Sequence, residues 1–289
     1  MKFVTYNYNG TEYVGVLTND ETSVIPASES GLKAGSMLEL IKELDGSYPA
    51  IPTQAKSIAL SAVKLEAPIP EPRQDVICLG LNYRDHVEEA TRADAVFDVQ
   101  RGDAVYFSKR LQRAVAPGGE IDGHFDICDS LDYEVELGVI IGRDAKNVKA
   151  ADAGKYIFGY TIINDVSARN LQTRHKQWYF GKSLDDFTPM GPCILSADEV
   201  GAMPELDIRC YVNGEKRQDS NTRMMIFDIP YIIEELSAGM TLKAGTVIAT
   251  GTPSGVALGM PPEVQKYLES GDVVRCEIDG IGVLENTIA

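Results

Sequence analysis

The sequence predicts a β-rich α+β protein with a small N-terminal α+β domain ahead of a larger domain. Strand-like segments outnumber helical ones, Asn-Gly and Asp-Gly turns recur between them, and a proline-rich stretch interrupts the chain near residue 70. Helices and strands do not alternate as they do in a dinucleotide-binding fold. We therefore expect domains at residues 1–70 and 71–289.

The N-terminal domain is predicted to begin with a hairpin. Residues 3–8 and 11–17 are strand-like and flank an Asn-Gly pair at 9–10, which is a strong signal for a two-residue turn. A short helix should follow Ser36, because Ser36 and Glu39 have the spacing of a capping box. Its apolar face would consist of Met37, Leu40, Ile41 and Leu44.

The larger domain follows a stiff connector, since residues 66–73 contain three prolines. One further helix is well marked, with Asp228 as its N-cap and Gly239 as its end. The other expected elements are strands, at residues 76–79, 135–141, 156–163, 208–212 and 273–278.

The composition excludes several classes of partner. The 289 residues carry a net charge of −16 with a pI near 4.6, so nucleic acid and anionic membranes would repel the protein. We find no apolar signal core and no run of membrane-spanning length, and we expect a cytoplasmic protein. The five cysteines are scattered without a C-x-x-C pair, which is typical of reduced thiols: Cys78, Cys128, Cys193, Cys210 and Cys276.

Two glutamates lie two positions apart in residues 131–141. On a strand, Glu134 and Glu136 share one face, and the opposite face is apolar. Two buried like charges this close require a proton or a metal ion to compensate them. With 43 acidic residues in the chain, chance alone places acids two apart about six times, so the strand by itself leaves both a metal site and a chance pair open.

A third acid, Asp165, ends the apolar strand of residues 156–163. It could cap a helix beginning near residue 167, or it could join the glutamates as a ligand. Three carboxylates that leave room for water and substrate suit Mg²⁺ or Mn²⁺, whereas zinc would favour His or Cys.

His86 is the strongest candidate base among three histidines. If residues 82–90 form a helix, His86 and Glu89 are i and i+3 on one face, and Glu89 can orient the imidazole. A solvated surface pair would have the same spacing.

Two further segments could contribute to a site. Lys182 lies among apolar residues and could offer a buried ammonium to an oxyanion, or it could extend its amine to the surface. Residues 250–255 could bind a carboxylate through N–H and O–H groups, or form only a tight turn.

Taken in order, these motifs resemble the fumarylacetoacetate hydrolase family over roughly residues 76–288. The motifs are G-x-N-Y-x-x-H-x-x-E, E-x-E-L-G, N-D-V-S-A-R-x-x-Q, G-K-S, V-N-G-E and T-G-T-P-x-G-V. The resemblance implies a mixed β-sandwich roll with a small N-terminal domain, and a homodimer. One departure is visible, because relatives usually read F-x-K-P where this chain has Arg110 after Lys109.

The resemblance also implies roles for individual residues. Glu134, Glu136 and Asp165 would hold the divalent metal, and His86 and Glu89 would form a catalytic dyad on a lid helix. Lys182 would be the active-site lysine. The positions that contact the ligand would be Arg169, Gln172 and Thr252.

The expected activity is hydrolysis of a carbon–carbon bond in an acylpyruvate or related 2,4-dioxo acid. The Mg²⁺ or Mn²⁺ ion would bind the 2-oxo acid and stabilise a pyruvate enolate, while His86 activates water. The same enolate chemistry allows a 2-oxo acid decarboxylase, for example of oxaloacetate, or an enol/keto isomerase. A pseudoenzyme that only binds a metabolite is a third hypothesis, and the complete set His86, Glu89 and Lys182 speaks against it.

Overall fold

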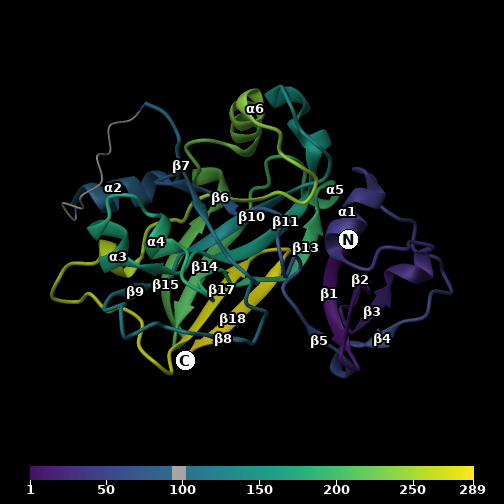
Figure 1. Cartoon of the computed structure of the whole chain (residues 1–289), viewed down its shortest axis with the longest axis horizontal. Coiled ribbons are helices and arrows are strands. Elements are labelled where there is room, and N and C mark those ends of the chain that lie inside the picture. The colour runs from purple at the N-terminus through teal and green to yellow at the C-terminus, as the bar shows by residue number, and fades with distance from the viewer. Residues whose placement is uncertain (93–101) are drawn as a thin grey trace.

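Most of the chain forms two mixed β-sheets that pack face to face (Figure 1). The computed structural model describes residues 1–92 and 102–289. Within them the larger sheet has eleven strands and the smaller has five, which confirms the predicted β-rich class. The larger sheet runs in the order β4 (Ile58–Ala59), β3 (Ser23–Pro26), β2 (Thr11–Leu17), β1 (Lys2–Tyr8), β13 (Met190–Ser196), β11 (Ile157–Asn164), β10 (Val135–Ile141), β16 (Val247–Ala249), β6 (Val76–Gly80) and β7 (Val105–Lys109), with β5 (Lys64–Leu65) paired to β1.

The smaller sheet covers one face of the larger one. Its order is β15 (Glu215–Asn221), β14 (Asp207–Val212), β17 (Val273–Ile278), β18 (Gly282–Ile288) and β8 (Glu120–Ile121), and β9 (Leu131–Asp132) pairs separately with β12 (Ser167–Ala168). The α-helices are α1 (Met37–Leu44), α2 (Arg84–Arg92), α3 (Arg169–Arg174), α4 (Tyr179–Lys182), α5 (Ala197–Val200) and α6 (Ile229–Gly239). The 3₁₀ turns are η1 (Ala27–Ser30), η2 (Leu60–Ala62), η3 (Ala150–Tyr156), η4 (Thr222–Met224) and η5 (Ala257–Gly259).

Strand β10 shows how the alternating sequence builds this core. Every second residue, from Val135 to Ile141, packs in the apolar core that contains residues of the smaller sheet. Ile140, on the other face, belongs to a second core that includes the apolar face of α1. Because β10 is buried on both faces, the polar Glu136 on it is enclosed by protein.

The N-terminal segment extends the larger sheet, since β1 pairs antiparallel with β13 through Phe3 and Ile194. The predicted hairpin and helix are both present: β1 and β2 turn at residues 9–10, and the Ser36 hydroxyl accepts the Glu39 N–H at 3.3 Å at the start of α1. A domain division at residue 70 stays a prediction.

The second predicted helix and the later hairpins are also present. Asp228 accepts the Tyr231 N–H at 2.8 Å and begins α6, while β14–β15 and β17–β18 turn at the expected Asn-Gly and Asp-Gly pairs. Helices α2, α3 and α4 gather at the end of the sheets that lies away from the N-terminal strands (Figure 1).

The turn from β6 into α2 depends on a buried asparagine. Leu81 has φ of 55°, a left-handed conformation that costs free energy for a branched side chain. The adjacent Asn82 is fully buried and does not cap α2, which begins at Arg84. Its amide donates to the carbonyls of Phe227 at 3.1 Å and Thr250 at 2.8 Å, and accepts the Phe227 N–H at 2.8 Å. These bonds fix the direction in which α2 leaves the sheet.

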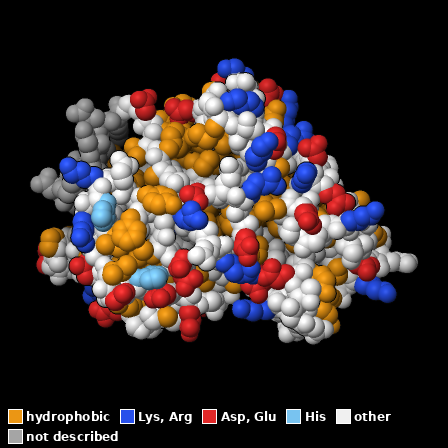
Figure 2. All heavy atoms as spheres, in the orientation of Figure 1, with side chains coloured by type: hydrophobic (Ala, Val, Ile, Leu, Met, Phe, Trp, Pro, Cys, Tyr) orange, Lys and Arg blue, Asp and Glu red, His pale blue; other side chains and the backbone are white. Residues whose placement is uncertain are grey.

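The surface carries charges of both signs. On the face in Figure 2, acidic and basic side chains are interspersed around hydrophobic patches. Within residues 1–92 and 102–289, no helix combines the length and the apolar character needed to cross a membrane.

We predict that Asn82→Ala lowers the free energy of unfolding by about 3 kcal/mol. The reason is that the carbonyls of Phe227 and Thr250 and the Phe227 N–H each lose their hydrogen-bond partner away from bulk water. Urea denaturation followed by circular dichroism measures the loss. Asn19→Ala, at an exposed position, is the control and should change stability by less than about 0.5 kcal/mol. Equal stabilities of the two variants would contradict this role for Asn82.

Candidate metal and acid–base site

Three carboxylates meet where β10 and β11 lie side by side. Glu134 precedes β10, Glu136 is its second residue, and Asp165 directly follows β11. Antiparallel pairing of Val135 with Asn164 brings Asp165 next to Glu134, whose carbonyl accepts the Asp165 N–H at 2.8 Å. One oxygen from each carboxylate lies within 4.8 Å of the others, and all three residues are buried. Asp165 is therefore part of this cluster and does not cap α3, where Ala168 is the N-cap.

Two buried lysines contact the cluster. The Lys182 ammonium lies 2.8 Å from Glu134 Oε2 and 2.7 Å from Asp165 Oδ2, so this side chain points inward and not to the surface. Lys109, at the end of β7, is fully buried and its ammonium lies 2.5 Å from Asp165 Oδ1. Lys109 also donates to the Val166 carbonyl at 2.9 Å.

The positive charges affect the carboxyl groups unequally. Burial opposes ionisation of Glu134, but the Lys182 ammonium and the Arg169 guanidinium outweigh it and lower the pKa of Glu134 to about 2. Burial and the neighbouring charges of Asp165 and Glu134 raise the pKa of Glu136 well above its usual range. Glu136 accepts the Gly251 N–H at 2.8 Å, and neither lysine reaches it closely enough to form an ion pair among the described residues. Glu136 is thus the carboxylate that lacks a compensating cation.

A divalent cation fits this arrangement. The lysines supply two positive charges against the three carboxylates Glu134, Glu136 and Asp165. The Lys182 ammonium lies between an oxygen of Glu134 and an oxygen of Asp165, so the cluster already binds one positively charged group. The donors are all carboxylate oxygens, the chemistry that hard ions such as Mg²⁺ and Mn²⁺ prefer. These three residues could therefore hold a metal ion.

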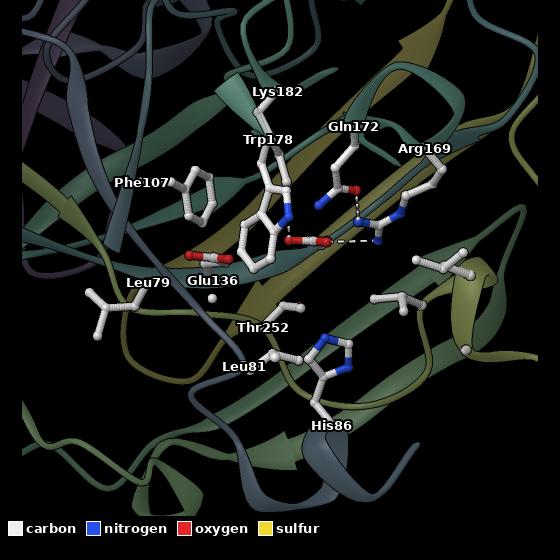
Figure 3. A pocket seen from close by; sticks show the side chains of 15 residues that line it. Leu79, Leu81, His86, Phe107, Glu136, Arg169, Gln172, Trp178, Lys182 and Thr252 are labelled. Atoms are coloured by element: carbon white, nitrogen blue, oxygen red, sulfur yellow. Dashed lines mark hydrogen bonds and ion pairs between the residues drawn. The ribbon is translucent and has the colours of Figure 1, made fainter. Parts of the chain in front are cut away.

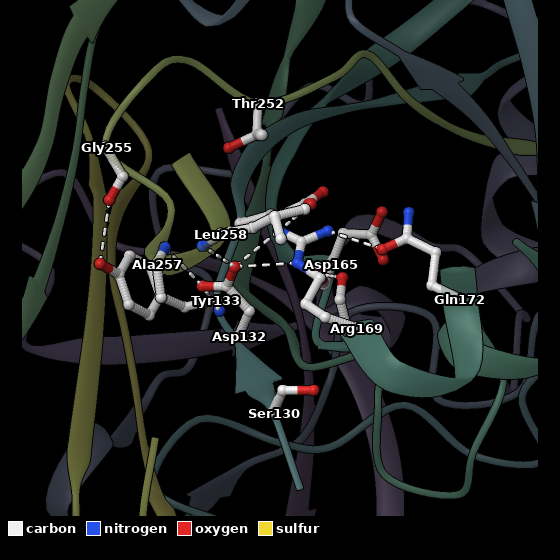
Figure 4. A network of polar contacts seen from close by, with 12 residues as sticks. Ser130, Asp132, Tyr133, Asp165, Arg169, Gln172, Thr252, Gly255, Ala257 and Leu258 are labelled. Carbon is white, nitrogen blue, oxygen red and sulfur yellow. Dashed lines mark hydrogen bonds and ion pairs between the residues drawn. The ribbon is translucent and has the colours of Figure 1, made fainter. Parts of the chain in front are cut away.

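Arg169 connects the cluster to a second buried acid, as Figure 4 shows. Its Nη2 lies 2.7 Å from Glu134 Oε1 and 2.8 Å from Asp132 Oδ2. Asp132 also accepts the N–H groups of Ala257 and Leu258 at 2.9 and 3.0 Å. One carboxylate therefore positions both the guanidinium and the chain at η5.

The three predicted ligand-contacting residues surround the same region. The guanidinium of Arg169 donates to Gln172 Oε1 at 2.9 Å, which leaves the amide nitrogen of Gln172 directed away from Arg169 (Figure 4). The Thr252 hydroxyl donates to the Val135 carbonyl at 3.0 Å and accepts from Gln218 at 2.8 Å. In the segment 250–255, backbone and hydroxyl groups thus bind β10 and Glu136.

His86 and Glu89 lie on one face of α2, as their spacing predicts. His86 Nδ1 is 3.1 Å from Glu89 Oε2, and Glu89 Oε1 accepts the Gly255 N–H at 3.0 Å. Glycine at 259 makes room for this carboxylate, because a Cβ there would lie 2.2 Å from Glu89 Cδ. With Nδ1 engaged, Nε2 is the ring atom available to a ligand.

His86 and the members of the cluster Glu134 and Glu136 line one small cavity of about 40 Å³, which Figure 3 shows from close by. Figure 3 shows its polar side toward Glu136 and Arg169 and its apolar side toward Trp178, Leu79 and Leu81. Its lining residues are Leu79, Gly80, Leu81, His86, Phe107, Glu134, Glu136, Arg169, Gln172, Trp178, Lys182, Thr252, Val256, Leu258 and Gly259.

Sequence reasoning missed three residues of this site: Asp132, Lys109 and Trp178. Asp132 had a usable signal, because it continues the two-residue spacing of Glu134 and Glu136. Lys109 had a weaker one, a lysine that ends a strand rich in apolar residues. Trp178 had none beyond being the single tryptophan of the chain.

Arg110, which stands where the family resemblance leads us to expect proline, forms a bond that proline cannot form. Its backbone N–H donates to the Ser183 hydroxyl at 3.0 Å. Ser183 follows Lys182, and Arg110 follows Lys109. The substitution therefore links the two segments that carry the buried lysines.

A comparison with protein families agrees with this site. Residues 75–289 match the model for the fumarylacetoacetate (FAA) hydrolase C-terminal domain. The match covers most of the chain, and the protein therefore belongs to the fumarylacetoacetate hydrolase family.

Individual relatives are similar over their whole length. Oxaloacetate tautomerase YisK of Bacillus subtilis is 40% identical, with 100% of both chains covered. The structure of fumarylacetoacetate hydrolase (EaFAH) from Exiguobacterium antarcticum has a TM-score of 0.86 and 37% identity, covering 100% of this chain and 99% of that one. A 2-hydroxyhepta-2,4-diene-1,7-dioate isomerase from Mycobacterium marinum has a TM-score of 0.76 and 30% identity, covering 100% and 98%. The expected family fold is thereby confirmed.

We predict that Glu136→Gln weakens Mn²⁺ binding at least about 100-fold, since even an indirect partner of a metal ligand contributes 10-fold to 100-fold. Isothermal titration calorimetry of metal-free protein measures the change. Glu120→Gln, an exposed position on β8, is the control and should keep the affinity of the unmodified protein. Unchanged Mn²⁺ affinity in Glu136→Gln would show that the cluster is not the metal site.

Proposed function

We propose that the protein interconverts the keto and enol forms of a short 2-oxo acid such as oxaloacetate, with Mg²⁺ or Mn²⁺ as its cofactor. The observation that carries this proposal is that His86, Glu134 and Glu136 line one cavity, which places a base opposite a cation-binding cluster. The 40% identity with an oxaloacetate tautomerase over both full chains supports the same activity.

Charge around the cavity favours an anionic substrate. A divalent cation held by the three carboxylates would supply a Lewis acid for the 2-oxo group. Arg169 and Lys182 line the cavity beside Glu134 and add positive charge there. Both side chains are buried, so their attraction for a carboxylate is screened less than it would be at the surface.

His86 is the group that moves the proton. Tautomerisation transfers one proton between C3 and the 2-oxygen and breaks no carbon–carbon bond. His86 Nε2 accepts the C3 proton, the electron pair of that C–H bond forms the C2–C3 double bond, and the π pair of the carbonyl moves onto the 2-oxygen, which then receives the same proton from the imidazolium. Glu89, 3.1 Å from Nδ1, stabilises the imidazolium, which returns the proton to C3 in the reverse direction.

We expect His86→Ala to lower kcat for oxaloacetate tautomerisation by about 100-fold to 10,000-fold, because it removes the general base. Disappearance of the enol form, followed by ultraviolet absorbance in the presence of Mn²⁺, measures the rate.

Two controls accompany this measurement. His175→Ala, at an exposed histidine, should retain the rate of the unmodified protein. Mn²⁺ affinity of His86→Ala should be unchanged, since His86 is not a member of the carboxylate cluster. A full rate in His86→Ala would refute its role as the base.

Hydrolysis of a carbon–carbon bond in an acylpyruvate is the second candidate. The same His86–Glu89 pair could activate a water molecule, and the similarity to a structure described as a fumarylacetoacetate hydrolase favours it. Decarboxylation of oxaloacetate would use the same cation without an activated water.

Product analysis separates these activities. With Mn²⁺ and enol oxaloacetate, we expect the keto form to accumulate much faster than pyruvate or carbon dioxide is released. With an acylpyruvate, we expect pyruvate release, detected with lactate dehydrogenase, to be slower than tautomerisation of oxaloacetate. Pyruvate release from the acylpyruvate at the faster rate would instead favour the hydrolase.

A further inference from the structure

Trp178 is the single tryptophan of the chain, and it lines the cavity that contains the carboxylate cluster. It is half-buried at the N-cap of α4, and its carbonyl accepts the Lys182 N–H at 3.1 Å. Figure 3 shows the indole beside Phe107 and Glu136, on the opposite side of the cavity from His86. The proposed chemistry gives this side chain no proton to transfer and no charge to stabilise.

Packing holds the indole in place. A Cβ at Gly80, the last residue of β6, would lie 2.2 Å from the Trp178 ring, so the ring lies against the backbone where a side chain would otherwise be. The Phe107 ring on β7 contacts it edge-on, with centroids 5.1 Å apart and planes at 71°. The neighbouring strands β6 and β7 therefore fix the position of the indole, which forms one wall of the cavity.

The wall leaves little space above the cluster. A cavity of about 40 Å³ holds roughly three or four water molecules. The remaining apolar walls come from two segments: Leu79 and Leu81 at the end of β6, and Val256 and Leu258 at η5. A 2-oxo acid that engages the cluster at one end meets an apolar surface at the other after a few carbons.

We propose that Trp178 limits the length of the 2-oxo acid that this site accepts. The inference rests on the proposed function for the 2-oxo acid class. Replacing the indole with a smaller side chain opens the cavity between β6 and β7 and leaves the three carboxylates and the lysines paired with them in the protein. Trp178 is thus a specificity-determining residue.

Binding measurements test the proposal without requiring turnover. We would titrate Mn²⁺-loaded protein by calorimetry with oxalate, and with straight-chain 2-oxo diacids of increasing length. In the unmodified protein, the affinity for these diacids should fall at least about tenfold once their carbon chain is too long for the cavity. In Trp178→Ala, the longer diacids should bind about tenfold more tightly than they bind the unmodified protein, while the affinity for oxalate should change by less than about threefold.

Three controls make the result decisive. Phe180→Ala removes an aromatic side chain that is 45% exposed on the same helix and should leave the length dependence unchanged. Trp178→Phe should shift the length limit less than Trp178→Ala, and it serves if the alanine variant does not fold. In the unmodified protein, tryptophan emission should change when oxalate binds, since Trp178 is its single source.

The outcomes distinguish the two proposals. The same length dependence in the unmodified protein and in both Trp178 variants would overturn the role of Trp178. Absence of binding by every 2-oxo acid and by oxalate would overturn the proposed function as well. The expected length dependence together with no tautomerisation of oxaloacetate would support the role of Trp178 and overturn the proposed reaction.

Discussion

Three carboxylates buried within 4.8 Å of one another are the constraint on which the rest of this structure depends. Carboxylates so placed repel each other strongly in a poorly solvated interior. Buried positive charges offset part of this repulsion. Asp165 forms ion pairs with Lys109 and Lys182, and Glu134 forms ion pairs with Lys182 and Arg169. Among the residues that the structure describes, Glu136 accepts a hydrogen bond only from the Gly251 N–H, and this difference from the other two acids is what suits the cluster to an added cation.

The same charges organise the walls of the cavity. Arg169 lies between Glu134 and Asp132, and Asp132 in turn binds the backbone of Ala257 and Leu258. The position of one wall is therefore set by a carboxylate that does not itself belong to the cluster. On the other side, Gly251 joins Glu136 to the segment whose Gly255 N–H binds Glu89. The acid–base pair and the cluster thus share a common support.

Two glycines determine how closely the remaining walls approach. Gly259 admits the Glu89 carboxylate, and Gly80 admits the Trp178 indole, each where a Cβ would come within 2.2 Å. The first close approach orients His86, and the second reduces the volume available to a ligand. In the proposed function, proton transfer by His86 and size selection by Trp178 would therefore depend on separate contacts.

The local sequence was sufficient to predict several of the strands, the two capped helices and the spacing that pairs His86 with Glu89. Those features depend on neighbours a few residues apart: Asn-Gly turns, the caps at Ser36 and Asp228, and the i, i+3 spacing on α2. The site residues shared by the motifs were identified through family resemblance, because spacing alone left the acid pair, Asp165 and Lys182 each with an ordinary alternative.

Only the tertiary structure decided which of those alternatives holds. The register of β10 with β11 brings Asp165 beside Glu134, and burial directs Lys182 inward. It also introduced Asp132, Lys109 and Trp178, whose partners lie 37, 56 and 98 residues away along the chain, at Arg169, Asp165 and Gly80. The sequence by itself determined the local elements and the residue types of the site. Charge balance and cavity size arise from long-range packing, which no local pattern encodes.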